Sequence, residues 1–295
     1  MSAGARLLAF AAAVLAVGAI AAAVGLAVPA VHHDGDDDGH GHGPADGHGD
    51  HPAHGDPGDP GAAAAGPGGL AATDGRLTLR LLDARRAAPG AGTLRFRILD
   101  PGGRPVTDMD VAHERRMHLI VASRDLAHFR HVHPVAGADG TWVADLDLPA
   151  AGAYRAFADF SHAGLPRTLG ADLLVDGPLR ARALPEPSDT ATGAGGYAAE
   201  VVERTARDGE TRLAYRVTRA GRPVSGITPY LGAAAHVVAL REGDLAFIHA
   251  HADDPAADGL LRAAVHAGPG RYRVFIEFRH AGAVRTVAHT LEVRR

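Results

Sequence analysis

Two histidine motifs of identical spacing are the strongest chemical feature of this 295-residue sequence. Each has the form His-x12-His-x-His, and together they comprise His118, His131, His133, His236, His249 and His251. Neutral imidazoles bind one ion at ~2.0–2.1 Å. Three nitrogen ligands suit Cu(II) or Zn(II), whereas Ca²⁺ and Mg²⁺ prefer oxygen. The motifs therefore predict copper or zinc ligands, with hydrogen-bonded packing histidines as the alternative.

Two β segments joined by a tight turn would position each motif. Residues i and i+2 of a strand share a face about 6–7 Å apart, so His131 and His133 would point the same way. A turn around Arg124-Asp125 would bring His118 opposite them, and the second copy has Gly243-Asp244 at its turn. Phe129 precedes His131 by two residues, so its side chain would point to the same face of the strand as both imidazoles. If it faces the core, the imidazoles would be structural, so this alternative stays open.

Other candidate ligands are weaker. His113 has no counterpart in the second copy, and Met117 would be the soft ligand if the first domain binds Cu(I). His162 and His280 each precede Ala-Gly in an apparent hairpin turn. The unrepeated His128, His266 and His289 are expected at the surface. The repeated Arg-Thr pairs at 167–168 and 285–286 are expected to form cross-strand ion pairs with Asp159 and Glu277 rather than a site.

The motifs belong to a longer internal repeat with a constant offset of 118 positions. Gly103-Arg104-Pro105-Val106 recurs as residues 221–224, and Phe157 and Phe160 recur as Phe275 and Phe278. This period is too long for a solenoid and indicates two duplicated domains, each large enough for its own core. We expect domains at 70–177 and 197–295, with a linker at 178–196.

Short segments separated by Gly, Pro and Asp clusters predict an all-β fold. In the first copy the expected strands are 77–82, 93–99, 117–123, 129–133, 141–148, 153–160 and 168–175. Seven strands in about 105 residues favour an immunoglobulin-like β-sandwich in each copy.

The N-terminal part indicates a location outside the cytoplasm. After Arg6, residues 7–31 carry no charge, and at ~1.5 Å per residue a helix of this length spans a ~30 Å hydrocarbon core. Residues 1–31 are thus an uncleaved membrane anchor or a cleaved signal peptide. Residues 32–69 are acidic, are expected to be disordered, and form a spacer or a metal-collecting tail. The tail histidines are His32, His33, His40, His42, His48, His51 and His54.

Composition excludes several function classes. With no cysteine, the chain has no disulfides, thiolate zinc sites, iron–sulfur clusters or blue-copper centre. A formal net charge of -4 without a basic stripe gives nucleic-acid binding no support. Three imidazoles with an open position could activate water, but no general base stands beside them in sequence, so we expect no enzyme and no catalytic residues.

The first motif and its flanks resemble a known family. The run His113-Glu114-Arg115-Arg116-Met117-His118 with Asp125-Leu126 and His131-x-His133-Pro134 is similar to bacterial extracytoplasmic β-sandwich proteins of copper and heavy-metal context, the YtkA-like and CopC-like proteins. The second copy repeats the pattern, and the resemblance covers about residues 75–295. It implies a secreted or surface-exposed β-sandwich with a metal role.

These observations predict a membrane-anchored or secreted extracytoplasmic protein that binds copper, or alternatively zinc, for capture, delivery or resistance. Its partners would be metal ions, the membrane and a metal transporter or other surface protein. Release of the metal is expected as the pH falls toward 6, because a protonated imidazole cannot ligate. The competing interpretation is a structural or interaction module without a metal site.

Overall fold

The described part of the computed structural model comprises residues 68–207, 210–252 and 258–294. It is all-β apart from one short 3-10 turn, which confirms the all-β part of the predicted fold class. The predicted anchor and most of the His-rich tail lie outside the described residues. Within the described residues, no helix is long and apolar enough to cross a membrane.

The first domain is the expected sandwich of two sheets. One sheet has the strand order β1-β3-β7-β6, and the other has the order β2-β9-β8-β4-β5. The strands are β1 (Thr78–Leu81), β2 (Arg85–Arg86), β3 (Gly90–Leu99), β4 (His118–Ser123), β5 (Phe129–Val132), β6 (Val135–Ala136), β7 (Trp142–Leu148), β8 (Gly152–His162) and β9 (Leu165–Val175). All seven strands expected from the sequence are present.

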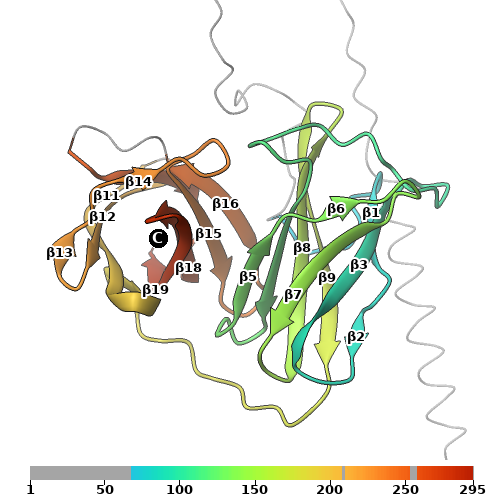
Figure 1. Cartoon of the computed structure of the whole chain (residues 1–295), viewed down its shortest axis with the longest axis horizontal. Coiled ribbons are helices and arrows are strands. Elements are labelled where there is room, and N and C mark those ends of the chain that lie inside the picture. The colour runs from blue at the N-terminus through green and yellow to red at the C-terminus, as the bar shows by residue number, and fades with distance from the viewer. Residues whose placement is uncertain (1–67, 208–209, 253–257, 295) are drawn as a thin grey trace, which may run out of the picture. The chain divides into compact units, whose positions relative to one another are not determined.

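The second domain departs from the expected sandwich. Its strands follow the order β11-β10-β19-β18-β15-β16-β17-β12, and β12 pairs again with β11, so the sheet closes on itself (Figure 1). The elements are β10 (Thr190–Gly193), η1 (Ala194–Gly196), β11 (Tyr197–Arg207), β12 (Glu210–Arg219), β13 (Arg222–Pro223), β14 (Ile227–Thr228), β15 (Ala235–Arg241), β16 (Phe247–Ala252), β17 (Leu261–His266), β18 (Gly270–His280) and β19 (Ala283–Val293). Closure uses β10, which lies inside the segment predicted as linker.

The burial of β4 shows that both of its faces are covered. Strand β7 alternates between buried and exposed residues, as expected when one face meets the core and the other meets solvent. All six residues of β4 are buried instead. Leu119 and Val121 face the core of the first domain, whereas Ile120 and Ala122 pack against the second domain. Strand β15 is buried in the same way, with Val238 and Leu240 at the interface.

Equivalent faces of the two domains form this interface. Phe129 stacks on Phe275 with ring centroids 4.1 Å apart, and the repeat-related pair Phe157 and Phe247 stacks at 5.0 Å. The contacts are therefore crossed, as in a two-fold symmetric dimer, although both halves belong to one chain. We call the buried apolar residues at this interface the interdomain apolar cluster.

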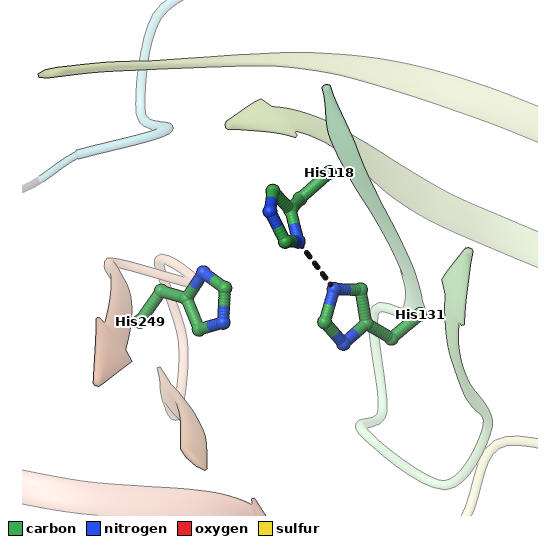
Figure 2. A group of neighbouring side chains, drawn as sticks. All are labelled: His118, His131 and His249. Carbon is green, nitrogen blue, oxygen red and sulfur yellow. Dashed lines mark hydrogen bonds between the residues drawn. The ribbon is translucent and has the colours of Figure 1, made fainter. Parts of the chain in front are cut away.

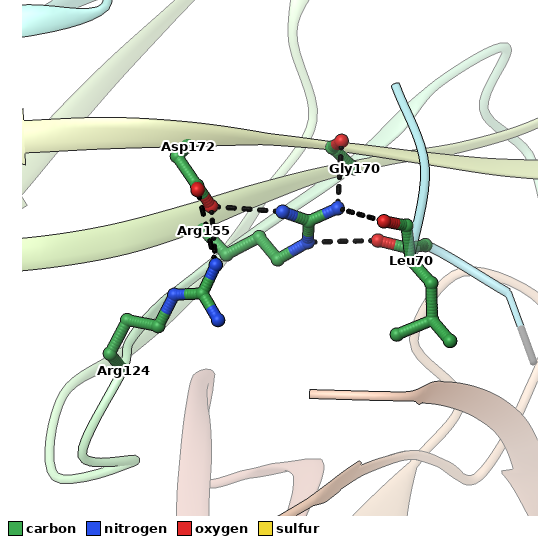
Figure 3. A network of polar contacts seen from close by, with 6 residues as sticks. Leu70, Arg124, Arg155, Gly170 and Asp172 are labelled. Carbon is green, nitrogen blue, oxygen red and sulfur yellow. Dashed lines mark hydrogen bonds and ion pairs between the residues drawn. The ribbon is translucent and has the colours of Figure 1, made fainter. Parts of the chain in front are cut away.

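The segment that enters the first domain also contacts both domains. The Gly68 carbonyl accepts a hydrogen bond from the Phe247 amide at 3.1 Å. The buried Arg155 guanidinium donates to the carbonyls of Gly69 and Leu70, each at 2.8 Å, and to that of Gly170 at 3.0 Å (Figure 3). Because Arg155 satisfies three backbone acceptors at once, it fixes this segment against the interface.

Candidate metal centre

Two hairpins carry the six repeated histidines to the interface. In the second domain, His236 on β15 pairs in register with His251 on β16, so the expected juxtaposition of the first and third histidines is present. In the first domain, His131 on β5 pairs with Ile120 on β4, and His133 directly follows β5. Asp125 and Asp244 accept hydrogen bonds from amides within the two turns, which stabilises each hairpin locally.

The interface explains why phenylalanine and histidine side chains lie on the same face of the strand. Phe129 does not face the core of the first domain; it belongs to the interdomain apolar cluster. The imidazoles that follow it at steps of two therefore lie on the same interdomain face. Phe247 precedes His249 and His251 in the same relation. The histidines of the two copies form one cluster between the domains, instead of two separate sites.

Four of the six imidazoles are mutually close, and we call them the central imidazoles: His118, His131, His236 and His249. Their six ring-centroid separations lie between 5.4 and 6.2 Å. Figure 2 shows three of these rings, two from the first domain and one from the second. Ligand atoms of His118, His131 and His249 all lie within 4.8 Å of one another, as do those of His236, His249 and His251.

Carboxylates hold two of the central imidazoles across the interface. The Nδ1 atom of His131 lies 2.7 Å from Glu277 Oε2, and that of His249 lies 2.8 Å from Asp159 Oδ2. Asp159 and Glu277 are themselves repeat equivalents, so each domain supplies the acceptor for the other domain's ring. If Nδ1–H donates to the carboxylate, the lone pair is on Nε2, as in carboxylate–histidine–metal arrangements.

Backbone carbonyls hold the other two central imidazoles. His236 Nε2 lies 2.9 Å from the Tyr230 carbonyl, and His118 Nε2 lies 3.5 Å from that of Ala112, its repeat equivalent. Donation from Nε2 leaves the lone pair on Nδ1. All four rings therefore have one nitrogen bonded outward and the other available to the interior of the cluster.

Several inward nitrogens have no hydrogen-bond partner. Among the described residues, His133 Nε2, His236 Nδ1, His249 Nε2 and His251 Nε2 are buried and unpartnered. In the first domain, His118 Nδ1 and His131 Nε2 lie 3.1 Å apart. Native proteins rarely bury polar atoms without partners, and a bound ion is one of the recognised explanations.

Burial keeps His118, His133 and His236 neutral. Desolvation is the largest cause that lowers the pKa of His118 to about 2, of His133 to about 3 and of His236 to about 4. The neighbouring imidazoles lower these pKa values further. Burial also raises the pKa of Asp159, while the hydrogen bond from Thr168 acts in the opposite direction. Neutral rings are the form that binds metal.

The weaker candidates divide into one neighbour of the cluster and three residues outside it. His113 stacks on His251 with ring centroids 3.6 Å apart. Met117 is 1% exposed and packs in the core of the first domain, so its interpretation as a soft ligand is wrong. His162 lies 3.4 Å from Asp108, and His280 Nδ1 lies 2.8 Å from the Tyr197 hydroxyl. The tail histidines lie outside the described residues.

The family of the chain follows from a profile match over both repeats. A family described as a domain of unknown function, DUF8832, matches residues 71–177 and 191–295. The chain belongs to the DUF8832 family. The two matched segments correspond to the two domains that form the interface described above. The resemblance to the YtkA-like and CopC-like proteins stays a prediction.

The solved structures that match this DUF8832 protein are distant from it. The Escherichia coli adhesin FdeC is 17% identical over 74% of this chain and 64% of its own, with a TM-score of 0.26. Invasin, a bacterial integrin-binding protein, is 15% identical over 74% of this chain and 40% of its own, with a TM-score of 0.24. None of these likenesses bears on function. No curated protein matches the chain.

The two carboxylates are the site residues that sequence reasoning misassigned. Asp159 and Glu277 accept hydrogen bonds from Thr168 and Thr286, at 2.7 and 3.1 Å, and do not form the expected ion pairs with the adjacent arginines. Their acidic character at equivalent positions of both copies was the available signal. The expected surface position of His289 is also wrong. It is 2% exposed, and its Nδ1 donates to the Ser188 carbonyl at 2.6 Å.

Proposed function

We propose that this protein binds a borderline metal ion, zinc or copper, through the interdomain histidine cluster. The observation that carries this proposal is the set of buried, unpartnered imidazole nitrogens in one cluster. The donor set consists of imidazole nitrogens, which suit Zn or Cu and do not suit Ca²⁺ or Mg²⁺. Carboxylates on the outer nitrogens would orient the rings and raise their basicity.

Capture or delivery outside the cytoplasm is the role that we propose for this binding. The support comes from the sequence of residues 1–69, where an uncharged segment precedes the His- and Asp-rich tail. The tail would raise the local metal concentration, and the cluster would retain the ion. We propose no enzymatic activity, since both carboxylates beside the rings accept hydrogen bonds from the imidazoles rather than facing the interior.

The proposal is tested by the thermal midpoint of the full chain with and without Zn(II) or Cu(II). A ligand stabilises only where it binds the folded chain better than the unfolded chain, so the midpoint reports sites that the fold builds. At free metal 100-fold above Kd we expect about 2.7 kcal/mol of stabilisation. His249→Ala should abolish the shift, because His249 belongs to both close triads.

His266→Ala is the matched control. This imidazole lies on β17 with its side chain 74% exposed, away from the cluster. Its removal should leave the metal-induced shift intact. An unchanged midpoint in the parent protein on adding either metal would show that the histidines only pack.

The low pKa values change the expected pH dependence of binding. Three imidazoles with the usual pKa of about 6.5 would weaken metal binding roughly 10⁴-fold between pH 7 and pH 5, through proton competition. Burial lowers the pKa of His236 to about 4 and also lowers the pKa of His249 well below its usual value, so their lone pairs stay available at pH 5. We therefore expect Kd for Zn(II) to rise by far less than about 10⁴-fold between pH 7 and pH 5. Release near pH 6 is therefore no longer expected.

A further inference from the structure

The four central imidazoles are arranged as the corners of a tetrahedron. Four points with six similar separations define a tetrahedron, whereas in a square the two diagonals are longer than the sides. The six centroid separations are similar, between 5.4 and 6.2 Å. Two corners come from each domain, at equivalent positions of the repeat.

The hydrogen-bond partners occupy one nitrogen of each ring and leave the other without a partner outside the four rings. Outward donation from His118 Nε2 and His131 Nδ1 leaves two lone pairs facing each other, 3.1 Å apart. Two facing lone pairs repel unless a proton or a cation lies between them. Tetrahedral coordination with metal–nitrogen bonds of ~2.0–2.1 Å places neighbouring nitrogens about 3.3 Å apart, close to the observed separation. The second-domain nitrogens, His236 Nδ1 and His249 Nε2, have no partner at all.

The close triads cannot be two independent full sites. Both contain His249, and its Nδ1 is bonded to Asp159 at 2.8 Å, so only Nε2 remains for a metal. One nitrogen lone pair binds one ion. Two ions, one per domain, would therefore compete for the same ligand.

We infer that one tetrahedral ion, with Zn(II) as the fitting metal, is bound between the domains by His118, His131, His236 and His249. This inference rests on the proposed metal-binding function and assigns its stoichiometry, geometry and metal. Four protein ligands fill a tetrahedral zinc site and leave no position for water, which is the arrangement of structural rather than catalytic zinc. Cu(II) prefers tetragonal geometry and fits these corners less well. The ion links two ligands of each domain.

The test uses Co(II) as a spectroscopic substitute for Zn(II) in the full chain. Tetrahedral Co(II) has intense visible bands that octahedral Co(II) lacks, so ions bound loosely elsewhere do not contribute. We expect the bands to saturate at one equivalent and to disappear when Zn(II) is added. His131→Ala and His249→Ala should each abolish the bands completely, although the two residues belong to different domains.

Two further variants separate ligand loss from misfolding. Glu277→Gln should keep the Nδ1–H acceptor of His131 but not its charge, and we expect Zn(II) affinity to fall about 10–100-fold. Asp159→Asn should have the same effect, because both carboxylates support one ion. His266→Ala, whose imidazole lies on β17 with its side chain 74% exposed, is the matched control and should keep the full band intensity. Circular dichroism of each metal-free variant checks that the β structure is intact.

The failures of the two proposals are distinguishable. Saturation at two equivalents, with half of the intensity surviving in each single variant, would overturn the shared centre and leave metal binding by the cluster standing. Octahedral spectra with a metal-induced midpoint shift would also refute the four-nitrogen centre alone. Absence of both bands and midpoint shift would overturn the centre and the proposed function together.

Discussion

Acid should destabilise the metal-free protein, because the folded protein buries neutral imidazoles. A folded-state pKa below the unfolded value of about 6.5 means that the unfolded chain binds more protons as the pH falls. The associated stability is fully present above pH 6.5 and is lost as the pH falls toward the folded pKa. Burial lowers the pKa of His236, which is fully buried, to about 4. Between pH 7 and pH 5 this one ring should cost about 2 kcal/mol.

The contribution of one ring is isolated by substitution. The Tyr230 carbonyl accepts a hydrogen bond from the His236 imidazole at 2.9 Å. In His236→Gln the side-chain amide can still donate to this carbonyl, but it does not titrate. We expect the loss of unfolding free energy between pH 7 and pH 5 to be about 2 kcal/mol smaller in this variant than in the parent. For a folded part of this size that corresponds to about 4–8 °C in thermal midpoint.

The assay is urea unfolding in the presence of a chelator, at pH 7 and at pH 5. His266→Gln, with its side chain 74% exposed, is the control and should retain the parent pH dependence. The raised pKa of Asp159 acts in the opposite sense, but it is common to the parent and both variants, so it cancels in the comparison. Equal pH dependence in parent and His236→Gln would refute the buried neutral ring.

Three further predictions concern packing around the centre. Met117→Leu should leave the affinity for Zn(II) unchanged and cost less than about 1.5 kcal/mol in urea unfolding, because Met117 fills the core and binds no ion. Phe129→Ala should cost about 3–5 kcal/mol in the same assay and weaken Zn(II) binding, because it removes the stack on Phe275 that aligns the domains. Gly69→Ala should expose the segment before β1 to limited proteolysis: Gly69 has φ of 72° and its added Cβ would lie 2.5 Å from the Phe157 ring.

The hairpins and the duplication could be predicted from the sequence because both depend on local signals. Strand alternation, turn aspartates and a constant offset of 118 positions need no knowledge of how the domains pack. The same alternation argues against Met117 as a ligand, because it directly precedes His118 and therefore points to the opposite face. The continuous apolar run Leu119–Ala122 was a further signal, since a strand without polar alternation is buried on both faces.

The shared centre and the closed sheet depend on contacts that are distant in sequence. The bond between His131 and Glu277 joins residues 146 positions apart in different domains, and no spacing within one motif encodes it. Closure of the second domain depends on β11 pairing with both β10 and β12. Strands β11 and β12 have 11 and 10 residues, whereas the first-domain edge strands have two or four. A motif alone could predict three ligands per domain but not which ligands would face one another.

Duplication within one chain allows a pseudo-symmetric site to become asymmetric. In a homodimer every substitution changes both halves, so the two acceptors across the interface would remain identical. Here one acceptor is Asp159 and the other is Glu277. In the first domain, His118 Nδ1 and His131 Nε2 are in direct contact at 3.1 Å. The second-domain nitrogens are already unpartnered, whereas the first-domain pair must separate slightly to accept an ion. Each half of the site can therefore change separately, which a homodimer does not allow.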